Sequence, residues 1–82
     1  MSEKFFRQVE LYRFIAENKY EATVSWVPEE IAKVGNLIRI KESSDSEWEE
    51  NWKVVKVYER KSLSQLSDKE RDYLKQRQAS DV

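Results

Sequence analysis

Apolar and polar residues alternate most regularly between residues 20 and 26. The apolar positions are Tyr20, Ala22, Val24 and Trp26, and every residue between them is polar. A period of two predicts a strand with one face against a core. The strand is expected to stop at Val27-Pro28, because proline has no N–H to donate to a neighbouring strand.

Residues 5–15 are rich in apolar side chains but lack a clean period. Odd positions include Val9 and Leu11, whereas Phe6, Tyr12 and Phe14 lie at even positions. A strand covered on both faces and a helix with one apolar stripe both fit this pattern. We favour a strand, because residues 17–19 are typical of a short polar hairpin loop leading into the strand at residue 20.

The only proline and the only glycine of the chain, Pro28 and Gly35, are predicted to enclose one helical turn. Proline fits the first position of a helix, and the two glutamates that follow it stabilise the positive end of the helix dipole. Gly35 is expected to end the turn in a left-handed conformation. Ile31 and Val34 would then share one face of the turn.

Two further strands and a helix are predicted in the second half of the chain. Residues 37–41 and 52–60 have the β-branched content of strands, and the acidic segment 42–50 between them is expected to be an exposed loop. Ser67 and Glu70 have the spacing of a capping box, which predicts a helix from Asp68 to about Arg77. Its apolar stripe would consist of Leu66, Tyr73 and Leu74.

These elements together predict a mainly β fold. Four to five strands with one helical turn between the second and third would form a small, bent antiparallel sheet, most similar to an SH3-like barrel. We divide the chain into a small β-barrel domain over residues 1–66, a C-terminal helix packed on it over residues 67–78, and a flexible tail over residues 79–82.

Three segments of the chain resemble short uncharacterised proteins of tailed bacteriophages. Residues 26–35 match W-(I/V)-P-E-x-x-A-x-V-G, residues 52–58 match W-x-V-x-x-V-Y, and residues 71–82 match R-D-Y-x-x-x-R-x-A-S-D-(I/V). The resemblance covers roughly residues 22–82, and the chain departs from it in a longer acidic loop and a longer N-terminal strand region. It implies a phage origin and a fold, but supplies no catalytic or binding residues.

Composition removes several classes of function. The 82-residue chain has neither cysteine nor histidine, so disulfides, thiolate or imidazole metal sites and a histidine proton shuttle are excluded. We therefore expect a protein that is not an enzyme, with no catalytic residues, no metal site and no cofactor. No apolar run approaches the roughly 20 residues that span a bilayer. We expect no membrane association and a place in the cytoplasm of the bacterial host cell.

Charge is balanced overall but unevenly distributed. The chain has 15 basic and 16 acidic residues. Residues 42–50 contain five acids and no base, whereas residues 53–61 contain four bases and Glu59. The two segments could neutralise each other across a hairpin, which we expect. A divalent cation in the acidic loop is not assigned, because the loop lacks a glycine for the sharp turn of a calcium site.

The candidate partner-binding residues come from three places. The basic strand and the terminal helix offer cations with an aromatic residue, a mixture that contacts phosphates and stacks on bases. On the helix, interleaved acids could instead satisfy the cations locally. A tryptophan in the acidic loop is either an anchor for a partner or a lid over the barrel mouth. The candidates are Trp48, Lys53, Lys56, Arg60, Lys61, Arg71, Tyr73, Lys75 and Arg77.

The sequence favours a non-enzymatic phage accessory protein that acts as a macromolecular interaction module, with a host or phage protein as its partner. One alternative is a nucleic-acid-binding protein. Another is a minor structural component of the virion that assembles by pairing of sheet edges. The oligomeric state is left open.

Overall fold

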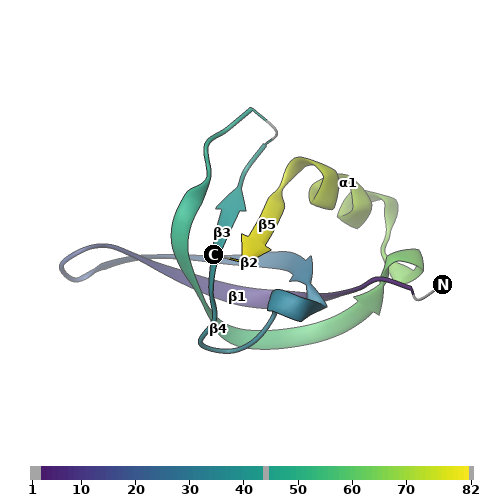
Figure 1. Ribbon diagram of the computed structural model, residues 1–82, viewed down its shortest axis with the longest axis horizontal. Coiled ribbons are helices and arrows are strands. Elements are labelled where there is room, and N and C mark those ends of the chain that lie inside the picture. The colour runs from purple at the N-terminus through teal and green to yellow at the C-terminus, as the bar shows by residue number, and fades with distance from the viewer. Residues whose placement is uncertain (1–2, 44, 82) are drawn as a thin grey trace.

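A computed structural model describes residues 3–43 and 45–81. Within these residues, five strands form one antiparallel sheet in the order β2-β1-β4-β3-β5 (Figure 1). The predicted mainly β class is confirmed. The elements in chain order are β1 (Phe5–Ala16), β2 (Lys19–Pro28), the 3-10 turn η1 (Glu29–Ile31), β3 (Leu37–Lys41), β4 (Glu49–Ser62), the 3-10 turn η2 (Leu63–Gln65), α1 (Asp68–Gln76) and β5 (Gln78–Asp81).

The sheet is bent but open. The long strand β4 pairs with both β1 and β3, while β2 and β5 form the two edges. No ladder joins β2 to β5 among the described residues, so the predicted small bent sheet is confirmed in its open form. The β1–β2 hairpin extends beyond the other elements as an arm, at the left of Figure 1.

The ambiguous segment 5–15 belongs to a strand. Val9 and Leu11 are fully buried, and their neighbours on the other face are only partly covered. Apolar residues occur at both odd and even positions of this strand. One face of the strand packs on the core, and apolar residues of the other face contribute to the exposed surface. The hairpin turns at Asn18, whose φ of 63° is left-handed, a conformation that asparagine tolerates.

The segment between Pro28 and Gly35 contains one 3-10 turn, as predicted in outline. Pro28 ends β2 and precedes the turn, whereas Gly35 has a φ of 91°. The prediction that Ile31 and Val34 share a face was wrong: Ile31 is buried and Val34 is 68% exposed. The physical reason is that the turn spans only three residues and ends at Ile31.

The core draws on four strands and the 3-10 turn. Trp52 is 3% exposed and belongs to it. Trp26 is also buried, at 7% exposure, with the ammonium of Lys61 over its ring at 5.6 Å from the centroid. The buried cluster consists of Val9, Leu11, Val27, Ile31, Ala32, Ile38, Ile40, Trp52 and Val54.

The predicted capping box and helix are confirmed. The Ser67 hydroxyl accepts from the N–H of Glu70 at 3.2 Å, and the Glu70 carboxylate accepts from the N–H of Ser67 at 2.8 Å. These two bonds satisfy amides that the helix cannot pair internally. Leu66, just before the helix, is buried. No helix in the described part of the chain is long and apolar enough to cross a membrane.

The expectation of a flexible tail over residues 79–82 was wrong for residues 79–81. Gln78–Asp81 forms β5, which pairs with β3 so that Ala79 lies opposite Ile40 and Ser80 opposite Arg39. Ala79 also packs against the core. The segment is ordered because β3 would otherwise leave a row of backbone N–H and C=O groups without partners. Val82 lies outside the described residues.

Candidate binding groove

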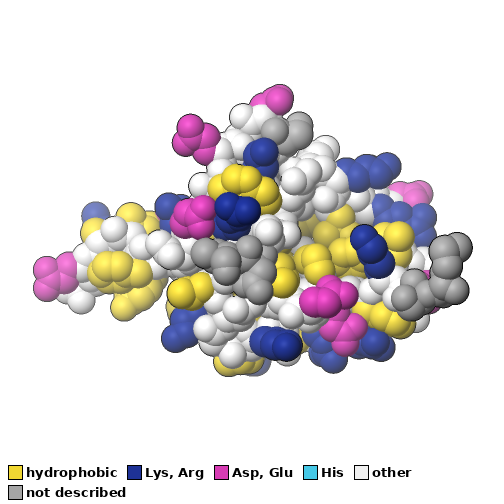
Figure 2. All heavy atoms as spheres, in the orientation of Figure 1, with side chains coloured by type: hydrophobic (Ala, Val, Ile, Leu, Met, Phe, Trp, Pro, Cys, Tyr) yellow, Lys and Arg dark blue, Asp and Glu magenta, His cyan; other side chains and the backbone are white. Residues whose placement is uncertain are grey.

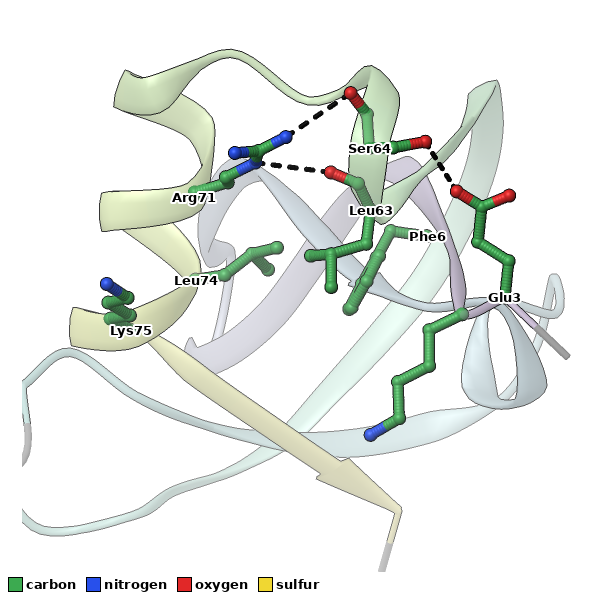
Figure 3. Close-up of a pocket in the computed structure, with 8 residues that line it drawn as sticks. Glu3, Phe6, Leu63, Ser64, Arg71, Leu74 and Lys75 are labelled. Atoms are coloured by element: carbon green, nitrogen blue, oxygen red, sulfur yellow. Dashed lines mark hydrogen bonds between the residues drawn. The ribbon is translucent and has the colours of Figure 1, made fainter. Parts of the chain in front are cut away.

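An open groove lies between the start of the chain, η2 and α1 (Figure 3). Its volume is about 810 Å³, which is in the range of ligand pockets. It is lined by Glu3, Lys4, Phe6, Leu63, Ser64, Arg71, Leu74 and Lys75.

The floor of the groove is apolar and comes from three elements. Phe6 of β1, Leu63 of η2 and Leu74 of α1 point toward one another (Figure 3). Leu63 is 43% exposed, and Phe6 and Leu74 are half-buried. Water is therefore in contact with apolar surface that an incoming apolar group would cover.

The 3-10 turn η2 is held in place from both sides. Its first N–H, from Leu63, donates to the carbonyl of Lys4 at 3.0 Å. The side chain of Gln65 accepts from the N–H of Ser62 at 2.8 Å, so the turn has its own capping box. The wall formed by Leu63 and Ser64 is thus fixed before any ligand arrives.

Arg71 ties α1 to this turn. Its Nε donates to the carbonyl of Leu63 at 3.2 Å and its guanidinium also donates to the carbonyl of Ser64 at 3.3 Å (Figure 3). Both acceptors are neutral, so these bonds orient the guanidinium without cancelling its charge. The positive charge of Arg71 therefore remains available at the rim of the groove.

The rim carries more positive than negative charge. Lys4 and Lys75 form no ion pair with another described residue, and Arg71 is bonded only to carbonyls. The one carboxylate, Glu3, accepts a hydrogen bond from the Ser64 hydroxyl. This bond lowers the pKa of Glu3 below its usual value of 4.5, so the carboxylate is ionised at neutral pH. Three cations against one anion leave a net attraction for negative charge.

Only two of the predicted site residues, Arg71 and Lys75, line the groove. Others are engaged elsewhere in the fold. Arg60 donates to Glu29 at 3.0 Å, and its guanidinium lies 3.7 Å from the ring centroid of Phe5. Lys61 lies 3.5 Å from the carboxylate of Glu70. These two cations of β4 are therefore structural partners of neighbouring elements.

Tyr73 and Arg77 also form internal contacts. The hydroxyl of Tyr73 lies 2.9 Å from the Ser25 hydroxyl oxygen on β2. Arg77 donates to the Tyr73 hydroxyl and lies 3.8 Å from the carboxylate of Glu42. The predicted basic face of the helix is thus divided between the sheet and the groove.

The remaining candidates lie away from the groove. Lys53 lines a second hollow beside the arm, and the ammonium of Lys56 lies 5.3 Å from the ring centroid of Tyr58. Trp48 is half-buried, with the guanidinium of Arg39 at 4.7 Å and the ammonium of Lys41 at 5.5 Å from its ring centroid. The indole thus packs on two cationic side chains of β3.

The expected neutralisation of the acidic loop by the basic strand was wrong. Glu49 pairs with Arg13 at 3.9 Å and Glu50 with Arg39 at 3.8 Å. The reason is that β4 already begins at Glu49, so these two acids extend the strand and face the neighbours of that strand. Among the described residues, no group of three acidic side chains could hold a metal ion.

Sequence reasoning missed the apolar floor and two charges of the rim. Phe6 and Leu63 are far apart in the sequence and meet because Phe5 pairs with Ser62 across the β1–β4 ladder. No local sequence pattern predicts such a long-range pairing. The chain matched no family model, no curated protein and no solved structure. The geometry of the groove is therefore the basis of the functional proposal.

Proposed function

We propose that this protein is a non-enzymatic interaction module that binds a segment of a partner protein in the groove between η2 and α1. The observation that carries the proposal is the apolar floor of Phe6, Leu63 and Leu74, open to solvent and surrounded by a cationic rim. A partner would insert one large apolar side chain and place a neighbouring carboxylate at the rim. Such anchors supply most of the binding energy at protein interfaces.

The charge of the rim sets the preferred partner chemistry. At the rim, Lys75 and Lys4 have no ion-pair partner among the described residues, and Arg71 presents a preoriented guanidinium. Complementary charges at an interface select the partner and raise the rate of association. The segment bound in the groove therefore carries Asp or Glu beside its apolar anchor.

The resemblance to phage proteins adds a setting to this proposal. The protein would be a phage accessory protein in the cytoplasm of a bacterial host cell, and its partner a host or phage protein. Nucleic-acid binding is the weaker alternative, because Arg60, Lys61 and Arg77 each contact a carboxylate of the same chain. A surface that reads phosphates needs such cations free of carboxylate partners.

A displayed library of random peptides, selected on the immobilised protein, tests the proposal. We expect enrichment of sequences with a large apolar residue next to Asp or Glu. Leu63→Ser and Lys75→Glu should each weaken binding of an enriched peptide by about tenfold, or about 1.4 kcal/mol.

Two variants outside the groove serve as matched controls. Leu37 has a similar exposure, 48%, and Lys53 is likewise a cation without an ion-pair partner among the described residues. Leu37→Ser and Lys53→Glu should leave peptide affinity unchanged. No enrichment, or equal losses in the control variants, would show that the groove is not the binding site. Binding of single-stranded DNA with a linear fall of log affinity against log salt would favour the nucleic-acid alternative.

A further inference from the structure

The arm formed by the β1–β2 hairpin exposes aromatic surface that the groove does not use. Phe14 and Tyr20 are 60% and 66% exposed, and their rings meet edge to face with centroids 5.4 Å apart. Hydrophobic side chains are visible at the left end of the molecule in Figure 2, where this hairpin extends in Figure 1. The two residues face each other across the hairpin register and therefore share one face of the sheet.

The edge of β2 is open along this arm. β2 is the first strand of the sheet order, and its far edge forms no ladder with another strand among the described residues. The carbonyl oxygen of Val24 lies 3.4 Å from the Tyr73 hydroxyl, so that carbonyl points away from β1. Outward groups recur at every second residue of an antiparallel edge, so Tyr20 and Ala22 also direct their backbone N–H and C=O outward. α1 limits the open edge to about residues 19–23.

The charges on this edge are self-complementary. Lys19 and Glu21 flank Tyr20 on the opposite face of the strand, and neither forms an ion pair with another described residue. If a second copy pairs antiparallel about a two-fold axis at Tyr20, Lys19 of each copy lies opposite Glu21 of the other. The same register joins the aromatic pairs of the two copies into one row of four rings on the other face.

We propose that two copies of this protein associate through β2, in the register that places Tyr20 opposite its own equivalent. Moving the two-fold axis by one residue, to Glu21, would place Glu21 opposite Glu21, which like charges disfavour. Moving the axis by two residues, to Ala22, would place Lys19 opposite Ser25, which is buried and in contact with Tyr73. A two-fold pairing uses the same edge in both copies and therefore stops at a dimer.

The overlap is short, so the dimer should form only at high protein concentration. A standard interface buries about 800 Å² on each partner, more than a few residues of edge strand can supply. In sedimentation equilibrium of the whole chain, the average mass should rise with concentration from 9.9 kDa toward twice that value. Lys19→Glu and Glu21→Lys alone should each lower the association constant by about tenfold, because like charges then face each other.

The double variant Lys19→Glu/Glu21→Lys restores both charge pairs in the proposed register and should restore the dimer. Both side chains are exposed, so the melting temperatures of all four proteins should stay close, with a small decrease for the variants that carry Glu21→Lys, because Glu21 lies opposite Arg13 in the β1–β2 register. Close melting temperatures exclude misfolding as the cause of a loss. Wild-type protein that stays monomeric at high concentration would overturn the proposal. Binding of single-stranded DNA by the arm of such a monomer would not rescue it. A dimer insensitive to the single reversals, or not rescued in the double variant, would overturn it as well.

Discussion

Tyr73 of α1 and Ser25 of β2 join the terminal helix to the edge of the sheet, with 2.9 Å between their hydroxyl oxygens. Ser25 is almost completely buried, and a buried hydroxyl needs a hydrogen-bond partner. Arg77, one turn later, donates to the Tyr73 hydroxyl and fixes its orientation. The aromatic residue of the helix thus has a structural partner within its own chain.

The Tyr73 contact predicts a measurable loss of stability. Tyr73→Phe removes the hydroxyl and leaves the Ser25 hydroxyl buried without this partner, which should lower the free energy of unfolding by about 1–2 kcal/mol. Denaturant unfolding monitored by tryptophan fluorescence measures the change. Tyr58→Phe is the control, because Tyr58 is 38% exposed and its hydroxyl forms no hydrogen bond with a described residue. Equal changes in the two variants would contradict the assignment.

Gly35 is required for its backbone conformation and not for lack of space. Its φ is 91°, and a Cβ built on it would meet no atom within 4 Å. Gly35→Ala should therefore lower the free energy of unfolding by roughly 1–2 kcal/mol, the steric cost of a left-handed residue. Val34→Ala, at the exposed neighbouring position, should change it by less than about 0.5 kcal/mol. A Gly35→Ala variant as stable as wild type in urea would refute this account.

Because β5 is a strand with one face on the core, a charge introduced on that face should destabilise the protein more than a charge on the other face. Ala79 packs against the core, whereas Gln78 is exposed. Ala79→Glu would bring a carboxylate toward apolar surface and should lower the free energy of unfolding by about 1–2 kcal/mol. Gln78→Glu, opposite Lys41 in the register, should be close to neutral. Thermal melts of both variants check this, and equal melting temperatures would mean that residues 78–81 do not pack as a strand.

The capping box of α1 predicts an acid-sensitive contribution to stability. The pKa of Glu70 is lowered from 4.5, mainly because its carboxylate accepts from the backbone N–H of Ser67, with Lys61 adding a favourable charge. Because the pKa of Glu70 is lower in the folded state than in the unfolded state, its ionised carboxylate stabilises the fold at pH values above the unfolded-state pKa near 4.5. This stabilisation is lost as the pH falls through the folded-state pKa. Glu70→Gln keeps an acceptor at the cap but cannot titrate.

The melting temperature of wild type should therefore exceed that of Glu70→Gln at neutral pH, and the difference should shrink between about pH 5 and pH 3. Adding salt at neutral pH should remove the part that arises from Lys61, whose ammonium lies 3.5 Å from the carboxylate. A difference that stays constant from neutral to acid pH would mean that the charge of Glu70 has no role in the cap.

Local signals in the sequence predicted the elements whose causes are local. The alternation from Tyr20 to Trp26, the breaks at Pro28 and Gly35, and the spacing of Ser67 and Glu70 each have a physical cause within a few residues. The corresponding strand, turn and helix all occur in the structure. The core face predicted for the strand was wrong except at Trp26, because Tyr20 and Val24 lie on the projecting part of β2 and are 66% and 47% exposed.

The parts that were missed depend on distant residues. Residues 78–81 are each small or polar and have little strand propensity of their own, and they form β5 because β3 offers an unpaired edge. The groove likewise exists only where β1 and the end of β4 bring Phe6 beside Leu63. Ion pairs such as Arg60–Glu29 follow the same ladders and could not be derived from charge counts along the chain.

The pairing of β5 with β3 has a consequence for synthesis of the protein in the cell. β5 follows every other described element along the chain. One edge of β3 therefore stays unpaired until residues 78–81 have left the ribosome. The β1–β2 hairpin can form much earlier, from neighbouring residues. Nascent chains of this protein are therefore vulnerable to strand-mediated aggregation until translation of this segment is complete.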